Sequence, residues 1–433
     1  MLSKKWNYSI IILRNGVISV AKPIKIRKIK KPLWYLRPII VVGSLFFTIF
    51  RKIKIKRINC ENLKWPYIVF ASHASFIDFP MNAAITFPHH ANYICSNEEF
   101  VGREWLFYGA GCFPKRKYTK DVTVVKNVLR VTKKLKNGVT VYPEARYSLI
   151  GINERIDGSL GKMVKSAGVP AVVMITNGNF LHQPQWRKKY KMNNPHEVIF
   201  KCVATKEEVE ILSADEIQKR IEEAFVYDDY KWQLDNGVKI KSKHRADGIH
   251  KVLYKCPHCG KDYSMQSKGT KLWCSDCGVT YEMNEYGQLE CLNAETKFSH
   301  APDWYKWERA EVVKEIENGT YRFEDNVRLE YLVNYQVGFQ ELGTVKFVHD
   351  MTGIHLHGKL NDGMPFDFDN PCSNTPSIHI DYNYKKRGTV EAGQALDINN
   401  LTSTWFIFPE TKNDVITKIH FAVEALYDYH TKK

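Results

Sequence analysis

The chain has 433 residues, of which 44% are hydrophobic, 13% aromatic and 25% charged. This length suggests about three domains, and the apolar content excludes a disordered chain because it is sufficient for folded cores. The formal net charge is +16, yet residues 1–57 contain fifteen Lys and Arg with no Asp or Glu, and the remainder is close to neutral. A basic patch confined to one end indicates a polyanionic surface as its partner.

The N-terminal segment mixes these charges with an apolar run, "KKPLWYLRPIIVVGSLFFTIFRKIKIKR". As a helix, the uninterrupted apolar part, residues 38–50, would extend about 20 Å, against roughly 30 Å of bilayer hydrocarbon. We therefore expect an in-plane or shallow re-entrant segment on an anionic membrane, with Trp34 and Tyr35 at the interface. The alternative is a nucleic-acid arm. No cleavage pattern follows the first apolar run, so the expected location is the cytoplasmic face of the membrane, peripheral or monotopic.

The stretch "VFASHASFIDFP", residues 69–80, places His73 five residues before Asp78, directly after an apolar run typical of a buried strand. Residues five apart point about 140° away from each other on a helix, so the two side chains can meet only across a strand-to-helix turn. There the carboxylate could fix the imidazole tautomer and leave the other ring nitrogen free to accept a proton. The alternative is that His73 caps the helix and Asp78 is a solvated acid.

Further along, strand-like runs such as "VTVYPEA" and "VPAVVMIT" alternate with helical ones, which predicts an α/β fold. One helix is expected to begin after the N-cap Asp121 and to end at Gly138. If the strands run parallel, "PEARYS" lies at the same sheet edge as His73, where α/β sheets bind their ligands.

Four blocks in this order, "SHASFIDFP", "GAGCFPKRK", "VYPEARYS" and "AGVPAVVM", resemble the glycerolipid acyltransferase family of the 1-acylglycerol-3-phosphate type, over roughly residues 65–176. The blocks of the family fall on His73 and Asp78, on Gly111, Phe113 and Arg116, on residues 142–148, and on Val169 and Pro170.

The resemblance implies that His73 is the base that removes the proton of an acceptor hydroxyl, with Asp78 orienting it. The hydroxyl then attacks the thioester of acyl-CoA or of an acylated acyl carrier protein. It further implies a lysophospholipid acceptor, 1-acylglycerol-3-phosphate by default, and acceptor contacts from Gly111, Lys115, Arg116, Glu144, Arg146 and Ser148. A guanidinium suits a phosphate because it binds two oxygens at once. A solvated basic turn is the alternative for Lys115 and Arg116, and a loop-holding hydrogen bond is the alternative for Glu144.

The third block departs from the family pattern. Ala145 stands in place of a glycine, Arg146 in place of a threonine, and Tyr147 in place of the arginine. The guanidinium has thus moved by one residue, which puts the acceptor head group in doubt more than the reaction class.

A different chemistry follows in "CPHCGKDYSMQSKGTKLWCSDCG", where two Cys-x2-Cys turns each end in a glycine. This spacing predicts a zinc ribbon with four thiolate ligands, Cys256, Cys259, Cys274 and Cys277. Four cysteines fill the coordination shell, so the zinc is expected to be structural. Zinc ribbons often bind nucleic acid, but this ribbon has few basic residues, and nucleic acid is not expected as a partner.

The expected organisation is therefore a membrane-associating segment (1–57), an α/β acyltransferase domain (58–240), a zinc ribbon (250–292) and a β-rich domain ending in a helix (300–433). The run "SADEIQKRIEEAFVYDDYKWQLDNG" predicts one amphipathic helix ending at Gly237. The last domain has the element order of a pleckstrin-homology-like barrel. Its histidines His349, His355, His357 and His379 are interpreted as hydrogen-bonded or exposed rather than metal ligands, because alternation places only His355 and His357 on one face. A non-catalytic lipid- or nucleic-acid-binding adaptor is the alternative function.

Overall fold

The computed structural model describes residues 11–14, 17–20, 27–50, 53–187, 190–384, 393–410 and 414–431. The expected membrane-associating segment therefore lies partly outside the described residues. Its described parts form a short antiparallel strand pair, β1 (Ile11–Arg14) and β2 (Val17–Val20), and the helix α1 (Leu36–Phe50).

The α/β part is built on one mixed seven-stranded sheet in the order β3-β9-β8-β4-β7-β5-β6. Its strands are β3 (Lys54–Ile58), β4 (Ile68–Ala71), β5 (Asn92–Ser96), β6 (Cys112–Lys115), β7 (Val139–Val141), β8 (Ala171–Asn177) and β9 (Glu197–Ala204). The strands β8, β4, β7, β5 and β6 run parallel, which meets the condition for residues 143–148 to share an edge of the sheet with His73, whereas β9 runs antiparallel to β8 and pairs with β3 in parallel. Both β4 and β8 are buried over their whole length, as their apolar sequences predict.

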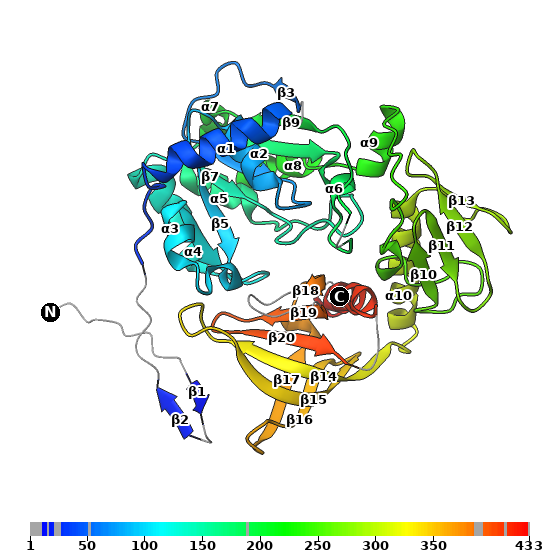
Figure 1. The fold of residues 1–433 in the computed structure, drawn as a ribbon. Coiled ribbons are helices and arrows are strands. Elements are labelled where there is room, and N and C mark those ends of the chain that lie inside the picture. The colour runs from blue at the N-terminus through cyan, green and yellow to red at the C-terminus, as the bar shows by residue number, and fades with distance from the viewer. Residues whose placement is uncertain are drawn as a thin grey trace.

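Helices cover this sheet, and α1 lies along α2 at its upper side (Figure 1). The α-helices that follow α1 are α2 (Asp78–Ile85), α3 (Glu104–Gly109), α4 (Val122–Leu129), α5 (Leu160–Ala167), α6 (Asn179–His182), α7 (Lys206–Ile211), α8 (Ala214–Ala224) and α9 (Asp229–Asp235).

Two predicted helices differ from the structure. Asp121 caps α4 as expected by accepting from the Thr123 amide at 2.7 Å, but the helix continues only through a π-turn over Arg130–Lys134, and Lys136 takes the left-handed conformation (φ 50°). Gly138 is required for another reason: a Cβ there would meet the Trp65 ring at 2.4 Å.

The single helix predicted to end at Gly237 is two helices, α8 and α9. The chain turns between them because Phe225 and Tyr227 point into the core and Asp228 caps α9 by accepting from the Lys231 amide at 2.8 Å.

Residues 250–292 form a separate antiparallel sheet of four strands, β10 (Met265–Lys268), β11 (Lys271–Cys274), β12 (Thr280–Met283) and β13 (Leu289–Cys291). Helix α10 (Ala301–Glu317) then leads into the C-terminal region.

The C-terminal region is one antiparallel sheet in the order β17-β16-β15-β14-β20-β19-β18, and it ends in helix α11 (Ile416–Thr431). Its strands are β14 (Arg322–Leu332), β15 (Gln340–Asp350), β16 (Gly353–Lys359), β17 (Pro365–Pro371), β18 (His379–Tyr384), β19 (Gly393–Asn399) and β20 (Thr404–Pro409). This confirms a β-rich region closed by a helix, and the pleckstrin-homology-like layout stays a prediction. Short 3₁₀ turns occur at Asn97–Phe100, Ile249–Lys251 and Cys372–Asn374.

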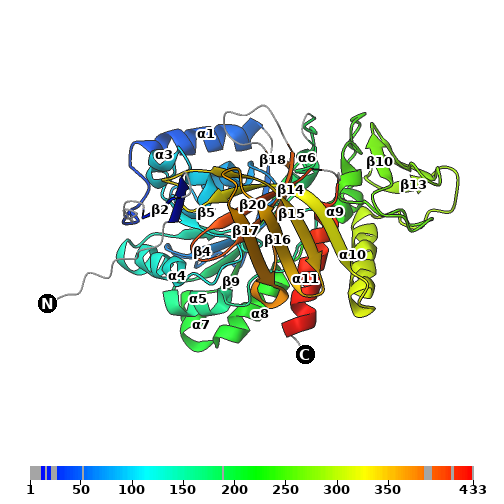
Figure 2. The ribbon, with the colours of Figure 1, turned by 90° about the horizontal axis from the view of Figure 1, so that it is seen from below.

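The parts of the molecule share cores. One buried cluster joins Leu149 and Phe180 of the α/β part with Leu272 of the ribbon, Trp304 of α10 and Phe421 of α11. Figure 1 shows the C-terminal sheet and α11 below the α/β part, on the side to which β5 points, and in Figure 2, seen from below, they lie in front of it, with the four-stranded ribbon to one side. The C-terminal region therefore lies against the carboxyl edge of the parallel strands.

Candidate active site

His73 and Asp78 meet across the turn between β4 and α2. The His73 Nδ1 lies 3.0 Å from Asp78 Oδ2, and the same oxygen accepts from the amides of Ala74 (2.7 Å) and Ser75 (3.0 Å). Asp78 is fully buried. Because a carboxylate only accepts, the ring carries its proton on Nδ1, and Nε2 keeps a free lone pair. The side chain of His73 is 23% exposed, so a substrate can reach it.

The other carboxylate oxygen of Asp78 is held by Asn179, which lies at the start of α6, just after β8. The Asn179 amide nitrogen donates to Asp78 Oδ1, and its oxygen accepts from the Ser75 hydroxyl at 2.9 Å. Sequence reasoning missed this residue, although the polar "NGN" directly after a buried strand of the same sheet was the signal that could have identified it. Asn179 is therefore a positioning residue for the pair.

Two tyrosines enclose the imidazole. The ring centroid of Tyr142 lies 4.0 Å from that of His73 in a stacked arrangement (21°), and that of Tyr147 lies 4.3 Å away, tilted by 46°. Burial, followed by the charge of Asp78, raises the pKa of both phenols, so they stay neutral. Tyr147 occupies the position where the resembled family has its arginine. An apolar ring thus stands here where the family pattern has a cation.

The third block supports His73 through its backbone. Ala145 takes the left-handed conformation (φ 56°), and the Ser148 amide donates to the His73 carbonyl at 2.7 Å. The Ser148 hydroxyl holds the next turn by donating to the Ile152 carbonyl (2.9 Å) and accepting from the Gly151 amide (3.0 Å). This loop fixes the chain on which the histidine is placed.

Glu144 lies inside the same loop rather than at its surface. It accepts from the Tyr227 hydroxyl at 2.9 and 3.0 Å and from the Glu154 amide at 2.8 Å. Burial raises the pKa of Glu144 to about 8, against the lowering effect of these hydrogen bonds. In this structure Glu144 has the geometry of a loop-holding residue.

Arg146 is buried against the C-terminal region. Its guanidinium lies 3.3 Å from Glu154 Oε2, 3.4 Å from Glu424 Oε1 of α11, and donates to the Ser377 hydroxyl at 3.1 Å. Burial alone would raise the pKa of Glu424, but the neighbouring guanidiniums of Arg146 and Arg309 lower it, whereas burial lowers the pKa of His420 and keeps that ring neutral. The structure therefore places Arg146 in an ion cluster between two parts of the chain.

The second block, residues 109–117, extends from the amino edge of the sheet to its carboxyl edge. Arg116 donates to the carbonyls of Val333, Leu401 (3.3 Å) and Thr402 (2.8 Å) in the C-terminal region. Gly111 (φ 84°) precedes β6 at the amino edge, where a Cβ would meet Pro32 at 2.6 Å, so it lies apart from His73.

Lys115 ends β6 at the carboxyl edge, and burial lowers the pKa of its amine. Within the described residues it makes no ion pair.

The four cysteines of the ribbon converge. The Sγ atoms of Cys256 and Cys277 are 3.6 Å apart, those of Cys259 and Cys274 are 3.8 Å apart, and all four lie within 4.8 Å of one another. Tetrahedral zinc with bonds of about 2.3 Å requires sulfur atoms about 3.8 Å apart. Gly260 and Gly278 are both left-handed, and their amides donate to the carbonyls of Cys256 and Cys274. The cluster could hold a metal ion with a filled thiolate shell.

Helix α1 presents an apolar face. Ile39, Val42 and Phe46 recur at helical spacing and are exposed, as are Trp34 and Tyr35 ahead of them. Among the described residues, no helix combines the length and the apolar character needed to cross a membrane.

Comparison with solved structures shows a structural likeness. The crystal structure of the 1-acyl-sn-glycerophosphate (LPA) acyltransferase PlsC from Thermotoga maritima resembles this chain with a TM-score of 0.36 and 19% identity, covering 44% of this chain and 77% of that one. No family model matches the chain. No curated protein matches it either.

Proposed function

We propose that this protein is a membrane-surface O-acyltransferase that moves a fatty acyl group from a thioester donor to a lysophospholipid hydroxyl. The observation that carries the proposal is the His73–Asp78 pair: a buried carboxylate held by two amides and by Asn179 fixes the proton of His73 on Nδ1, and Nε2 remains accessible at the carboxyl edge.

In the proposed reaction, His73 Nε2 takes the proton of the acceptor hydroxyl as its oxygen attacks the thioester carbonyl carbon. The C–O bond forms, the C–S bond of the tetrahedral intermediate breaks, and the imidazolium returns the proton to the leaving thiolate. The ester and the free thiol of the donor are the products. Asp78 stabilises the imidazolium that exists between the two proton transfers.

Acceptor and donor follow from the resemblance described above. The default acceptor is 1-acylglycerol-3-phosphate, and the donor is acyl-CoA or an acylated acyl carrier protein. Because Arg116 and Arg146 contact the C-terminal region, Lys115 is the cation of these blocks best able to meet the acceptor phosphate. The basic N-terminal segment and the apolar face of α1 support a peripheral position on an anionic cytoplasmic membrane face. Zinc is the proposed metal of the four cysteines.

The test is an activity panel of acyl-CoA and acylated acyl carrier protein against several lysophospholipids. His73→Ala should lower transfer about 10²- to 10⁴-fold, the usual contribution of a general base. His244→Ala is the matched control, because His244 forms the same kind of pair, Nδ1 to Asp247 Oδ2 at 2.9 Å, outside the site. Near-parent activity of the His73 variant would refute the mechanism.

A non-catalytic lipid- or nucleic-acid-binding adaptor is the second candidate, and one observation favours it. Both guanidiniums that were expected to contact the acceptor, those of Arg116 and Arg146, are already bound by groups of this chain. An absence of turnover with every donor and acceptor of the panel would support the adaptor.

A further inference from the structure

A cavity of about 160 Å³ lies at the edge of the sheet opposite to His73. One water needs roughly 10–15 Å³ of such volume, so this space admits several waters or one polyatomic ion. Its wall includes Lys31, Arg37, Trp65, His89, His90 and Lys136. Trp65, His90 and Lys136 come shortly before β4, β5 and β7, which are parallel, so these residues gather at the amino edge. We refer to this space as the amino-edge cavity.

The amino-edge cavity has a cationic wall. Lys31, Arg37 and Lys136 bring three fixed positive charges, and no Asp or Glu lines it. Within the part of the chain that the structure describes, none of these three side chains makes an ion pair. All three side chains are exposed, and their common position on the wall gives the cavity a positive potential that favours an anion.

His90 also lines the cavity, and its ring can donate a hydrogen bond that no described residue accepts. It is 3% exposed, and neither of its ring nitrogens has a hydrogen-bond partner among the described residues. A buried imidazole without a partner is costly, and a ligand in the cavity would relieve that cost. The neighbouring His89 ring is stacked on Trp65, with centroids 4.6 Å apart, which holds its position at the cavity wall. Burial, followed by the charge of Arg37, lowers the pKa of His90 to about 4, so the ring is neutral at pH 7.

We propose that the amino-edge cavity is a binding site for a phosphate-bearing anion, separate from the site of acyl transfer. Lys31, Arg37 and Lys136 supply the charge, and His90 supplies an N–H donor from the interior. The strands that separate the two edges are on the order of 13 Å long. The phosphate of the proposed acceptor is only a few bonds from its reacting hydroxyl, so it cannot reach the cavity while that hydroxyl lies at His73. The phosphate therefore belongs to a molecule other than the proposed acceptor.

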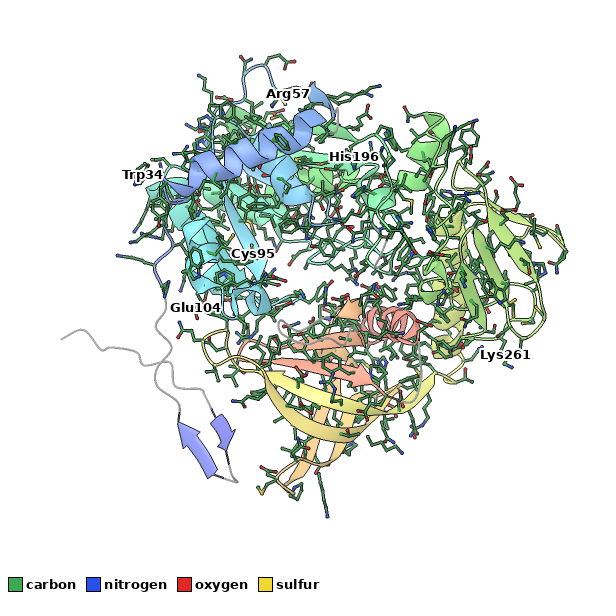
Figure 3. The ribbon with its side chains drawn as sticks, in the orientation of Figure 1. Trp34, Arg57, Cys95, Glu104, His196 and Lys261 are labelled. Carbon is green, nitrogen blue, oxygen red and sulfur yellow. The ribbon has the colours of Figure 1, made fainter. Side chains whose placement is uncertain are left out.

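The surroundings favour a membrane phospholipid as the source of the phosphate. Arg37 lies on α1, whose exposed Ile39, Val42 and Phe46 form the apolar face described above. Two more exposed aromatic side chains belong to this region. Trp34 is labelled near one end of α1 in Figure 3, and Phe87 lies two residues before His89. A headgroup in the cavity would thus leave its acyl chains beside apolar side chains. A soluble phosphate ester is the other source of the same chemistry.

The first experiment titrates the full zinc-loaded chain with inorganic phosphate by calorimetry at constant ionic strength. Lys31→Gln/Arg37→Gln should bind phosphate at least tenfold more weakly than the parent chain. Lys241→Gln/Lys243→Gln removes the same charge from exposed positions outside the cavity and should bind like the parent. His90→Leu should also weaken binding but unfold at the same or a higher temperature, because the parent ring has no partner to lose.

The second experiment compares vesicles of phosphatidylcholine with vesicles that also contain phosphatidic acid, at high salt. If the source is a lipid, the cavity variant loses its preference for phosphatidic acid while the control keeps it. If the source is a soluble phosphate ester, the cavity variant binds both kinds of vesicle as the parent does and differs from it only in the calorimetric titration. Equal phosphate affinity and equal vesicle binding for parent, cavity variant and control would overturn the proposal, as would the absence of phosphate binding to the parent.

Discussion

At the scale of single residues, burial decides what the side chains of the third block can do. Glu144 and Arg146 are two residues apart in the block for which the resemblance implies acceptor contacts, yet both are buried and bound by groups of the protein. Their neighbour Tyr147 takes the position beside His73 instead. In this structure the side chain of the block that lies beside the imidazole is therefore an aromatic ring and not a guanidinium.

The raised pKa of Glu144 predicts how the stability of the protein depends on pH. This pKa is raised by burial from 4.5 to about 8, so between these values the folded chain holds a proton that the unfolded chain has released. Stability should therefore fall as pH rises through this window, by about 1.4 kcal/mol per pH unit for this one group. Glu144→Gln has no proton to lose and should remove that part of the slope.

The measurement for Glu144 is denaturant unfolding at pH 5, 6, 7 and 8. Glu210→Gln is the control, since Glu210 is exposed on α7 and the slope of that variant should equal the parent's. Identical slopes for the parent and Glu144→Gln would contradict the assignment of a buried proton.

At the scale of elements, the apolar face of α1, formed by Ile39, Val42 and Phe46, is exposed within the described part of the chain. Replacing Ile39 and Val42 by glutamate should weaken binding to phosphatidylglycerol vesicles at least about tenfold, because two apolar side chains no longer enter the interface. The control variant replaces Ile211 and Val226 by glutamate. These two side chains are also exposed but lie outside α1, so the control should bind vesicles like the parent. Cosedimentation across a salt series measures both. Unchanged binding of the α1 variant would assign the membrane contact to another segment.

We expect the ribbon to depend on the metal that its four cysteines could hold, because its four strands are short. Zinc in small thiolate modules supplies about 10–16 kcal/mol, most of which becomes folding free energy. Cys256→Ser should therefore lose the ion and expose residues 250–292 to proteolysis, whereas the parent holds about one zinc per chain. Cys291→Ser is the matched control, since Cys291 lies in β13 of the same ribbon but outside the four-cysteine cluster. A full zinc content in Cys256→Ser would refute the ligand set.

The ribbon variant also tests whether the zinc is structural. Because His73 and Asp78 lie on a different sheet, transfer to a soluble acceptor should partly survive in Cys256→Ser. Loss of zinc that stops the reaction while the chain remains folded would instead place the metal in the chemistry.

At the scale of the whole molecule, an ion cluster joins the α/β part to the C-terminal region. Glu424 of α11 lies 2.5 Å from Arg309 Nη1 and 3.4 Å from Arg146 Nη1, and it accepts from the Ser377 hydroxyl at 2.6 Å. Glu424→Gln keeps the shape but leaves Arg146 buried without this counter-charge. We expect it to lower the free energy of unfolding by about 3 kcal/mol.

The same helix provides the control for Glu424. Asp428 forms an exposed pair with Arg155 at 2.8 Å one turn later, and Asp428→Asn should cost less than about 1 kcal/mol. Denaturant unfolding followed by tryptophan fluorescence measures both variants. A similar cost for the two would show that the buried cluster does not hold the two parts together.

Much of the local structure could be predicted from short stretches of sequence. The strand before His73, the cap at Asp121 and the two cysteine turns each depend on residues within about twenty positions, and apolar periodicity and turn chemistry report on such distances. Strands without a strong apolar pattern were missed, among them β6, which carries Pro114 at the sheet edge, and β19.

By itself, the sequence determined that His73 and Asp78 follow a buried strand and that four cysteines have the spacing of a metal site. Only the tertiary structure decided that Arg116 and Arg146 contact the C-terminal region and that Asn179 holds Asp78. The physical reason is distance along the chain. Arg146 and Glu424 are separated by 278 residues, and no local pattern encodes which buried charges will meet when separate sheets pack together.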